Sequence, residues 1–186
     1  MSQQPPLAIV GHAYRAPGVG RKGLWEFLEA GKSAWSPAPF DRFNQEVYYH
    51  PDAEKSGFIS SKGSRFLPDD IYAFDPSFFE ISAKEARSMD PQHRLLLECA
   101  FEAAENAGLR LSDLLDSNAG VFAASVDSEY NDAMAEDMPT SSKYMALGIA
   151  PIMFANLLSY FFGLTGPSIT VDATCASSSY ALHLTY

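Results

Sequence analysis

The residues best suited to covalent chemistry lie around Cys175, eleven residues before the last residue of the sequence. The β-branched run from Ser168 to Val171 predicts a short strand. A stretch typical of a helix, residues 177–186, follows the cysteine. Ala173 and Ala176 are small, so a substrate could approach the sulfur closely. The pattern predicts a strand-turn-helix elbow that carries one cysteine on its turn.

A helix that begins at such a turn could activate the sulfur. Free backbone N–H groups and the positive end of the helix dipole favour the thiolate, which is the nucleophilic form of cysteine. The same N–H groups can stabilise the oxyanion that forms when sulfur attacks a carbonyl group. From this spacing alone Cys175 could equally be a small buried side chain, which is how single cysteines usually serve.

The sequence around Cys175 resembles the active-site signature of the β-ketoacyl synthases. Residues 171–179 are Val-Asp-Ala-Thr-Cys-Ala-Ser-Ser-Ser, against the family's Asp-Thr-Ala-Cys-Ser-Ser-Ser. Other motifs resemble the family in order and spacing, among them Leu7 to Gly11, Leu24 to Leu28, Phe40 to Phe43, Tyr48 to Asp52 and Met89 to Glu98. The last run is similar to type I polyketide synthases and related multidomain fatty acid synthases, and the nearest likeness is to iterative fungal polyketide synthases.

This resemblance implies a thiolase-like α/β fold, layered α/β/α with a mixed sheet. Residues 1–186 are then expected to form the N-terminal portion of a β-ketoacyl synthase domain, an incomplete half that ends shortly after the elbow. The sequence departs from the family pattern at Leu157, where an arginine is usual, and in the inverted order of Ala173 and Thr174. Losing the arginine removes a charge that could pair in the core.

The resemblance also implies an acyltransferase. Cys175 would accept an acyl chain from the phosphopantetheine thiol of an acyl carrier protein, with no cofactor bound directly. A decarboxylative Claisen condensation with a malonyl-type extender would then lengthen the chain by two carbons, in polyketide or fatty acid biosynthesis. The expected partners are the acyl carrier protein and a second copy of the chain, as a homodimer.

The family's cysteine works with two histidines and a lysine from later segments, so Cys175 is the only catalytic residue that carries over. An alternative is therefore a catalytically incomplete synthase fragment or an interaction module. A cysteine protease is a weaker alternative, because no signature of such a family is present.

The four histidines and the second cysteine are weaker candidates for chemistry. His183 would lie ~12 Å along the helix axis from Cys175, too far for contact. His93 is expected to have a structural role near a helix start, and His12 and His50 are assigned no role. Cys99, inside the same predicted helix, is expected to be a packing residue. No spacing typical of metal ligands is present.

Composition excludes some classes of function. The net charge of −10, from 13 basic and 23 acidic residues, argues against nucleic acid binding. Two cysteines without a disulfide framework favour a reducing compartment, and we expect the cytoplasm. The uncharged stretch from Tyr144 to Val171 is long enough for a membrane span, but Pro151 and the pair Gly166-Pro167 interrupt it. A buried helix that leads to the Cys175 strand is the preferred interpretation.

Several further elements follow from periodicity and capping. Leu7 to Val10 and Ala119 to Ala124 predict buried strands, and Gly20 to Ala30 predicts a helix. Residues 36–66 predict a long ordered loop. Pro91 to Ala107 predicts the strongest helix, capped by Asp90 and ended by Gly108, with Leu96 and Ala100 on a face that packs on a sheet. The acidic run from Asp127 to Asp137 predicts a solvated face.

Overall fold

The computed structural model describes residues 6–126, 130, 132 and 144–185. The chain divides into two compact units. The larger comprises Met1–Ala13 and Tyr72–Tyr186, and the smaller comprises Tyr14–Ile71. The acidic run at 127–137, predicted to form a solvated face, lies outside the described residues except at Tyr130 and Asp132; Asp132 is exposed.

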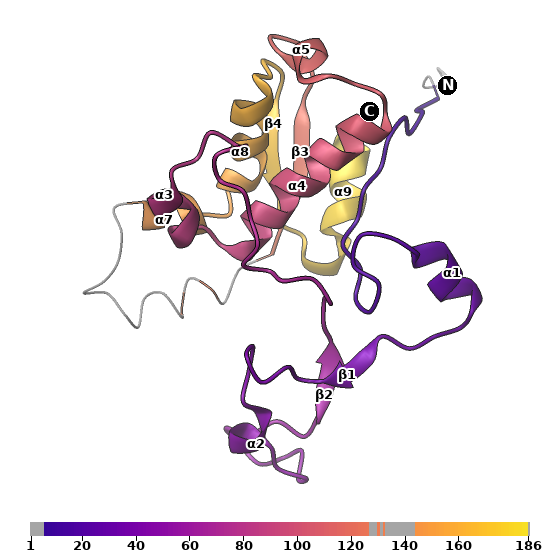
Figure 1. The fold of residues 1–186 in the computed structure, drawn as a ribbon, viewed down its shortest axis with the longest axis vertical. Helices are drawn as coiled ribbons and strands as arrows, with labels where there is room; N and C mark the ends of the chain where they lie inside the picture. The colour runs from indigo at the N-terminus through magenta and orange to yellow at the C-terminus, as the bar shows by residue number, and fades with distance from the viewer. Residues whose placement is uncertain (1–5, 127–129, 131, 133–143, 186) are drawn as a thin grey trace. The chain divides into compact units, whose positions relative to one another are not determined.

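The larger unit is built around a pair of parallel strands. β3 (Val121–Ala124) pairs with β4 (Ser168–Val171), so that Val121 lies opposite Ser168 and Ala124 opposite Val171. Parallel strands need a long connection, and α7 (Met145–Ile149) and α8 (Met153–Phe162) lie within it. α8 and α9 (Ser177–Leu184) both pack against this strand pair (Figure 1). The strand predicted at 168–171 is confirmed, and the one predicted at 119–124 begins two residues later.

The uncharged stretch before β4 forms part of the core. α8 buries Phe154, Ala155, Leu158 and Phe162. Leu157 is partly buried against the same core, so an apolar side chain suits the position where the family usually has an arginine. Within the part of the chain that the structure describes, no helix has the length and apolar character needed to cross a bilayer.

α4 (Pro91–Asn106) begins and ends as its sequence predicts. The Asp90 Oδ1 atom accepts a hydrogen bond from the Gln92 N–H at 2.7 Å, and Pro91 occupies the first turn. Gly108 follows the C-cap with a φ of 74°, a conformation that suits glycine. The predicted buried face is confirmed in part, because Leu96 and Ala100 pack against the main core. The most buried side chains, however, are His93, Arg94 and Leu97, and α4 packs against α8.

Aromatic side chains dominate the main core of the larger unit. Its buried members are Phe79, Met89, Leu97, Leu158 and Phe162. Phe79 stacks on Phe74 with ring centroids 5.1 Å apart, and its ring centroid lies 4.8 Å from that of Phe161. Two short helices, α3 (Ala83–Ser88) and α5 (Leu111–Leu114), lie before and after α4 in the sequence. The core thus ties α4 to α8, which in turn supports the strand pair.

The predicted strand at Leu7 to Val10 was wrong. Ile9 is 86% exposed and Val10 72% exposed, and neither belongs to a strand. A strand needs a neighbour that takes up its N–H and C=O groups, and none of the described strands pairs with this segment. The segment instead runs beside α4 (Figure 1), where the His12 N–H donates to the Asn106 Oδ1 atom at 3.1 Å.

The smaller unit contains one antiparallel strand pair and two short helices. β1 (Trp35–Pro37) pairs with β2 (Gly63–Arg65). α1 (Leu24–Glu29) is shorter than the helix predicted at 20–30 and begins after Gly23, whose φ is 81°. The predicted long loop is confirmed only in part, because it also carries α2 (Gln45–Tyr48) and both strands.

A single carbonyl joins α4 to α7. The Gly148 carbonyl oxygen accepts hydrogen bonds from the Asp90 N–H and the His93 Nδ1–H, each at 2.8 Å. Gly148 packs so closely on the Ser88 carbonyl that no Cβ would fit there. The His93 ring also packs against Phe154 with its centroid 4.2 Å from that of the phenyl ring. His93 therefore has a structural role, as expected, but it serves a tertiary contact and not its own helix start.

We predict that Leu97→Ala destabilises the chain strongly. Leu97 is 1% exposed in the main core, and truncating such a side chain costs about 3 kcal/mol in transfer and cavity terms. The free energy of unfolding in urea, followed by circular dichroism, would measure this. Leu109→Ala removes the same atoms from a side chain that is 40% exposed and is the matched control. Equal losses in the two variants would contradict the assigned core.

We predict that His93 makes the chain less stable at acidic pH. Burial lowers the pKa of His93 below its ordinary value of 6.5, against smaller opposing effects of the Gly148 hydrogen bond and of Asp90. Below pH 6.5 the unfolded chain therefore binds a proton that the folded chain resists, and stability falls as the pH falls toward the lowered pKa. Above pH 6.5 this contribution is fully present.

The measurement is the free energy of unfolding between pH 7.5 and 5, at constant ionic strength. His93→Gln should lose part of the acid-induced fall, whereas His183→Gln, which changes an exposed histidine on α9, should retain it. A slope unchanged in His93→Gln would contradict the assignment.

Candidate active site at Cys175

Cys175 lies on the predicted elbow and is exposed. β4 ends at Val171, a single turn of 3-10 helix covers Thr174–Ala176, and α9 begins at Ser177. The side chain is therefore not the small buried residue that the motif alone left possible. The helix predicted at 177–186 is confirmed as far as Leu184.

The residue before the cysteine is held in a disfavoured conformation. Thr174 has a φ of 50°, which is unusual for a β-branched residue and costs about 1–3 kcal/mol unless its surroundings enforce it. The Asp172 Oδ1 atom accepts a hydrogen bond from the Thr174 N–H at 3.0 Å. This bond fixes the peptide unit that precedes Thr174.

Ser177 fixes the other side of the turn. Its Oγ atom accepts a hydrogen bond from the Ala173 N–H at 2.8 Å and donates one to the Thr174 carbonyl oxygen at 2.7 Å. Ser177 is 4% exposed. The sequence analysis treated it only as a small residue. The signal for its role was a serine three residues after Thr174, a spacing at which hydroxyl groups often bond to the backbone.

α9 begins close to Cys175 without a side-chain cap. Its N-cap is Ala176, which has no side-chain oxygen to accept from the first N–H groups. These donors and the positive end of the helix dipole are next to the sulfur in the sequence, where they can stabilise a thiolate or an oxyanion. The arrangement can support attack by sulfur on a carbonyl carbon.

The structure gives the other candidate residues different places. His93 is buried at the junction of α4 and α7, and His183 is exposed in the last turn of α9. The His50 Nδ1 atom accepts from the Asp52 N–H at 3.1 Å in the smaller unit. Cys99 is half-buried on α4, in line with a packing residue. Among the described residues, no group of three His, Cys, Asp or Glu side chains could hold a metal ion.

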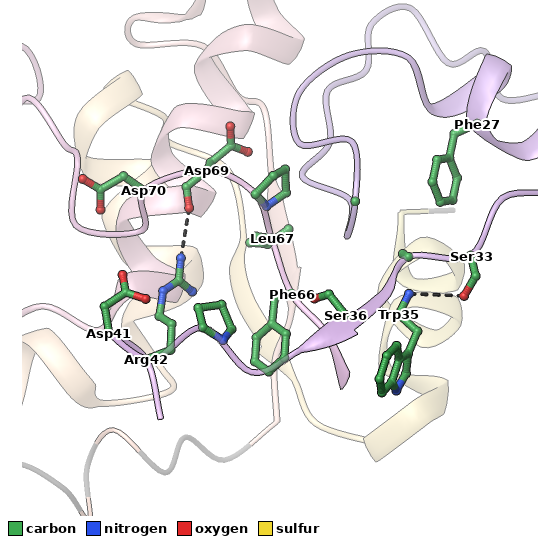
Figure 2. A pocket seen from close by; sticks show the side chains of 14 residues that line it. Phe27, Ser33, Trp35, Ser36, Asp41, Arg42, Phe66, Leu67, Asp69 and Asp70 are labelled. Atoms are coloured by element: carbon green, nitrogen blue, oxygen red, sulfur yellow. Dashed lines mark hydrogen bonds between the residues drawn. The ribbon is translucent and has the colours of Figure 1, made fainter. Parts of the chain in front are cut away.

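The smaller unit contains a separate pocket of about 680 Å³. Figure 2 shows charged side chains at one end, including Asp41 and Arg42, and Phe27 and Trp35 at the other. The Arg42 Nη2 atom donates to the Asp69 carbonyl oxygen at 3.0 Å. Its lining contains no cysteine or histidine, so the pocket offers no counterpart to the cysteine on the elbow.

Comparison with known proteins places these features in one family. Residues 4–186 match the family model described as the N-terminal domain of β-ketoacyl synthase. The highly reducing polyketide synthase valA of Aspergillus terreus is 59% identical over 181 residues, and a highly reducing polyketide synthase of Preussia isomera is 50% identical over 179. These matches cover 97% and 96% of the chain, which spans only 7% of each relative's length.

Solved ketosynthase structures share the fold. An oxazolomycin ketosynthase domain of Streptomyces albus superposes with a TM-score of 0.84 at 32% identity, over 95% of this chain and 30% of that one. The ketosynthase from module 6 of the bacillaene synthase of Bacillus subtilis gives 0.78 at 32% identity, over 95% and 28%. The elbow, the motifs and these matches show that the chain belongs to the β-ketoacyl synthase family of polyketide synthases and has its thiolase-like α/β fold.

Proposed function

We propose that Cys175 is the nucleophile of an acyl transfer that precedes carbon–carbon bond formation. The Cys175 thiol loses its proton to solvent, and its sulfur attacks the carbonyl carbon of an acyl thioester. A new carbon–sulfur bond forms, the bond to the carrier thiol breaks, and the released thiolate takes up a proton. The acyl group is then held on Cys175 as a thioester.

One observation supports this step above the others. The exposed cysteine lies between a strained residue and a helix start without a side-chain cap. The strained turn fixes the sulfur relative to β4, and N–H groups at a helix start without a side-chain cap can stabilise the negative charge of the tetrahedral intermediate. Such donors strengthen as charge develops, which is what lowers a barrier.

The carrier and the second substrate follow from the family. We propose that the acyl group arrives on the phosphopantetheine thiol of an acyl carrier protein. A malonyl-type extender then loses carbon dioxide, and its carbanion attacks the Cys175 thioester, so the product is a β-ketoacyl chain two carbons longer. Among polyketide synthases this reaction extends the growing chain.

We also propose that the protein works as a homodimer. Large apolar side chains are exposed on β4 and α9, namely Ile169, Tyr180, Leu182 and Leu184. Exposed apolar side chains that lie on neighbouring elements are typical of surfaces that bind another protein.

A second candidate function is acyl uptake without condensation. It is favoured by the positions of two histidines, neither of which is placed to assist Cys175. The His93 Nδ1–H is used in the bond to Gly148, and His183 lies in the last turn of α9, away from the end that follows Cys175. Release of carbon dioxide from a malonyl thioester by the acylated chain separates the two candidates. Release above the rate of the Cys175→Ala variant supports condensation.

We predict that a short acyl thioester modifies Cys175 and spares Cys99. The exposed thiol on the elbow should form one thioester per chain, because Cys99 is half-buried on α4. Intact mass would show the addition of one acyl group, and peptide mapping would locate it. Cys175→Ala should abolish the addition, and Cys99→Ser should retain it. An unmodified wild-type chain, or modification that persists in Cys175→Ala, would contradict the proposed function.

A further inference from the structure

We propose that Ser177 is a positioning residue for the Cys175 nucleophile, acting through the backbone of Thr174. This inference rests on the proposed function, since it assigns a role in the same acyl transfer. Ser177 follows the cysteine by two residues and is nearly inaccessible to solvent. Its hydroxyl is therefore placed to shape the turn and not to contact a substrate.

The Ser177 hydroxyl spans the strained residue. It accepts from the N–H of Ala173, the residue before Thr174, at 2.8 Å, and donates at 2.7 Å to the Thr174 carbonyl oxygen, in the peptide unit after Thr174. The Ser177 N–H also donates to the Thr174 carbonyl oxygen. Ser177 thus holds the peptide unit after Thr174 and the N–H of the residue before it, while Asp172 holds the Thr174 N–H between them; the φ of this threonine is 50°.

These bonds set the direction of the cysteine's own N–H. The Thr174 carbonyl and the Cys175 N–H belong to one planar trans peptide unit and point in opposite directions. Bonds that hold the carbonyl oxygen therefore also aim the Cys175 N–H away from Ser177. If the Ser177 hydroxyl is lost, Thr174 can relax toward the allowed β region, which rotates this peptide and shifts the sulfur.

A shift of this kind affects acylation and alkylation differently. Acylation needs the sulfur and the oxyanion donors in a fixed geometry around one carbonyl group. Alkylation by iodoacetamide needs only an accessible thiolate and forms no oxyanion. If Ser177 has a positioning role, its loss slows the acylation of Cys175 and leaves the alkylation of Cys175 nearly unchanged. Loss of folding would instead expose the half-buried Cys99 and raise the rate of its alkylation.

We predict that Ser177→Ala slows acylation of Cys175 about tenfold and leaves its alkylation by iodoacetamide within about twofold, since two hydrogen bonds that orient the turn are lost. The probe is the butyryl thioester of N-acetylcysteamine, and both rates are followed on the full 186-residue chain by mass spectrometry of the Cys175 peptide. Thr185→Val is the matched control, because it removes a hydroxyl bond to the Leu182 carbonyl oxygen at the other end of α9.

Asp172→Ala provides a second variant at an exposed side chain, so folding is not at stake. It removes the other bond to Thr174 and should slow acylation in the same direction. Unchanged acylation in Ser177→Ala would overturn this inference alone. If the acylation and the alkylation of Cys175 change in parallel and Cys99 is alkylated faster, Ser177 has only a structural role, and this inference is overturned as well. A wild-type chain that is alkylated but not acylated would overturn both this inference and the proposed function.

Discussion

The parallel pairing of β3 with β4 is the constraint on which the site depends. β4 ends at Val171, so the pairing fixes where the chain leaves the sheet and enters the turn that carries Cys175. α8 and α9 each pack against both strands and so stabilise the strand pair. The Ala155 N–H donates to the Thr170 Oγ1 atom at 3.3 Å, which links α8 directly to the strand before the elbow. The position of the sulfur therefore also depends on β3 and α8, which are far from it in the sequence.

The elbow combines a strained residue with side chains that stabilise it. A positive φ at Thr174 is tolerated because Asp172 and Ser177 bond to the peptides around it. Strain held in this way reduces the number of directions that the Cys175 side chain can take, so less ordering is needed when a substrate binds. The same sharp turn leaves Cys175 exposed and ends where α9 begins. In the proposed chemistry the exposed sulfur attacks the thioester, and the start of α9 stabilises the oxyanion.

Local signals in the sequence predicted much of the larger unit. The boundaries of β4 and the caps of α4 follow from β-branched residues, Asp90, Pro91 and Gly108, whose effects act within a few residues. The run at 7–10 failed because apolar character alone does not supply a neighbouring strand. The buried face of α4 was predicted only in part: Leu96 and Ala100 do pack in the core, but the burial of His93 depends on the Gly148 carbonyl, which lies 55 residues away in the sequence.

By itself the sequence determined the family and the strand-turn-helix order around Cys175, the proposed nucleophile, since these depend on residue types and short spacings. Only the tertiary structure decided that Thr174 takes a left-handed conformation and that the Ser177 hydroxyl spans it. It also decided that His93 is buried against the Gly148 carbonyl, where burial lowers its pKa. The contact of His93 with Gly148 forms only after α4 and α7 have packed, so no local pattern of residues encodes it. The Ser177 bonds lie within five residues, but the conformation of Thr174 that they span is set where β4 gives way to α9.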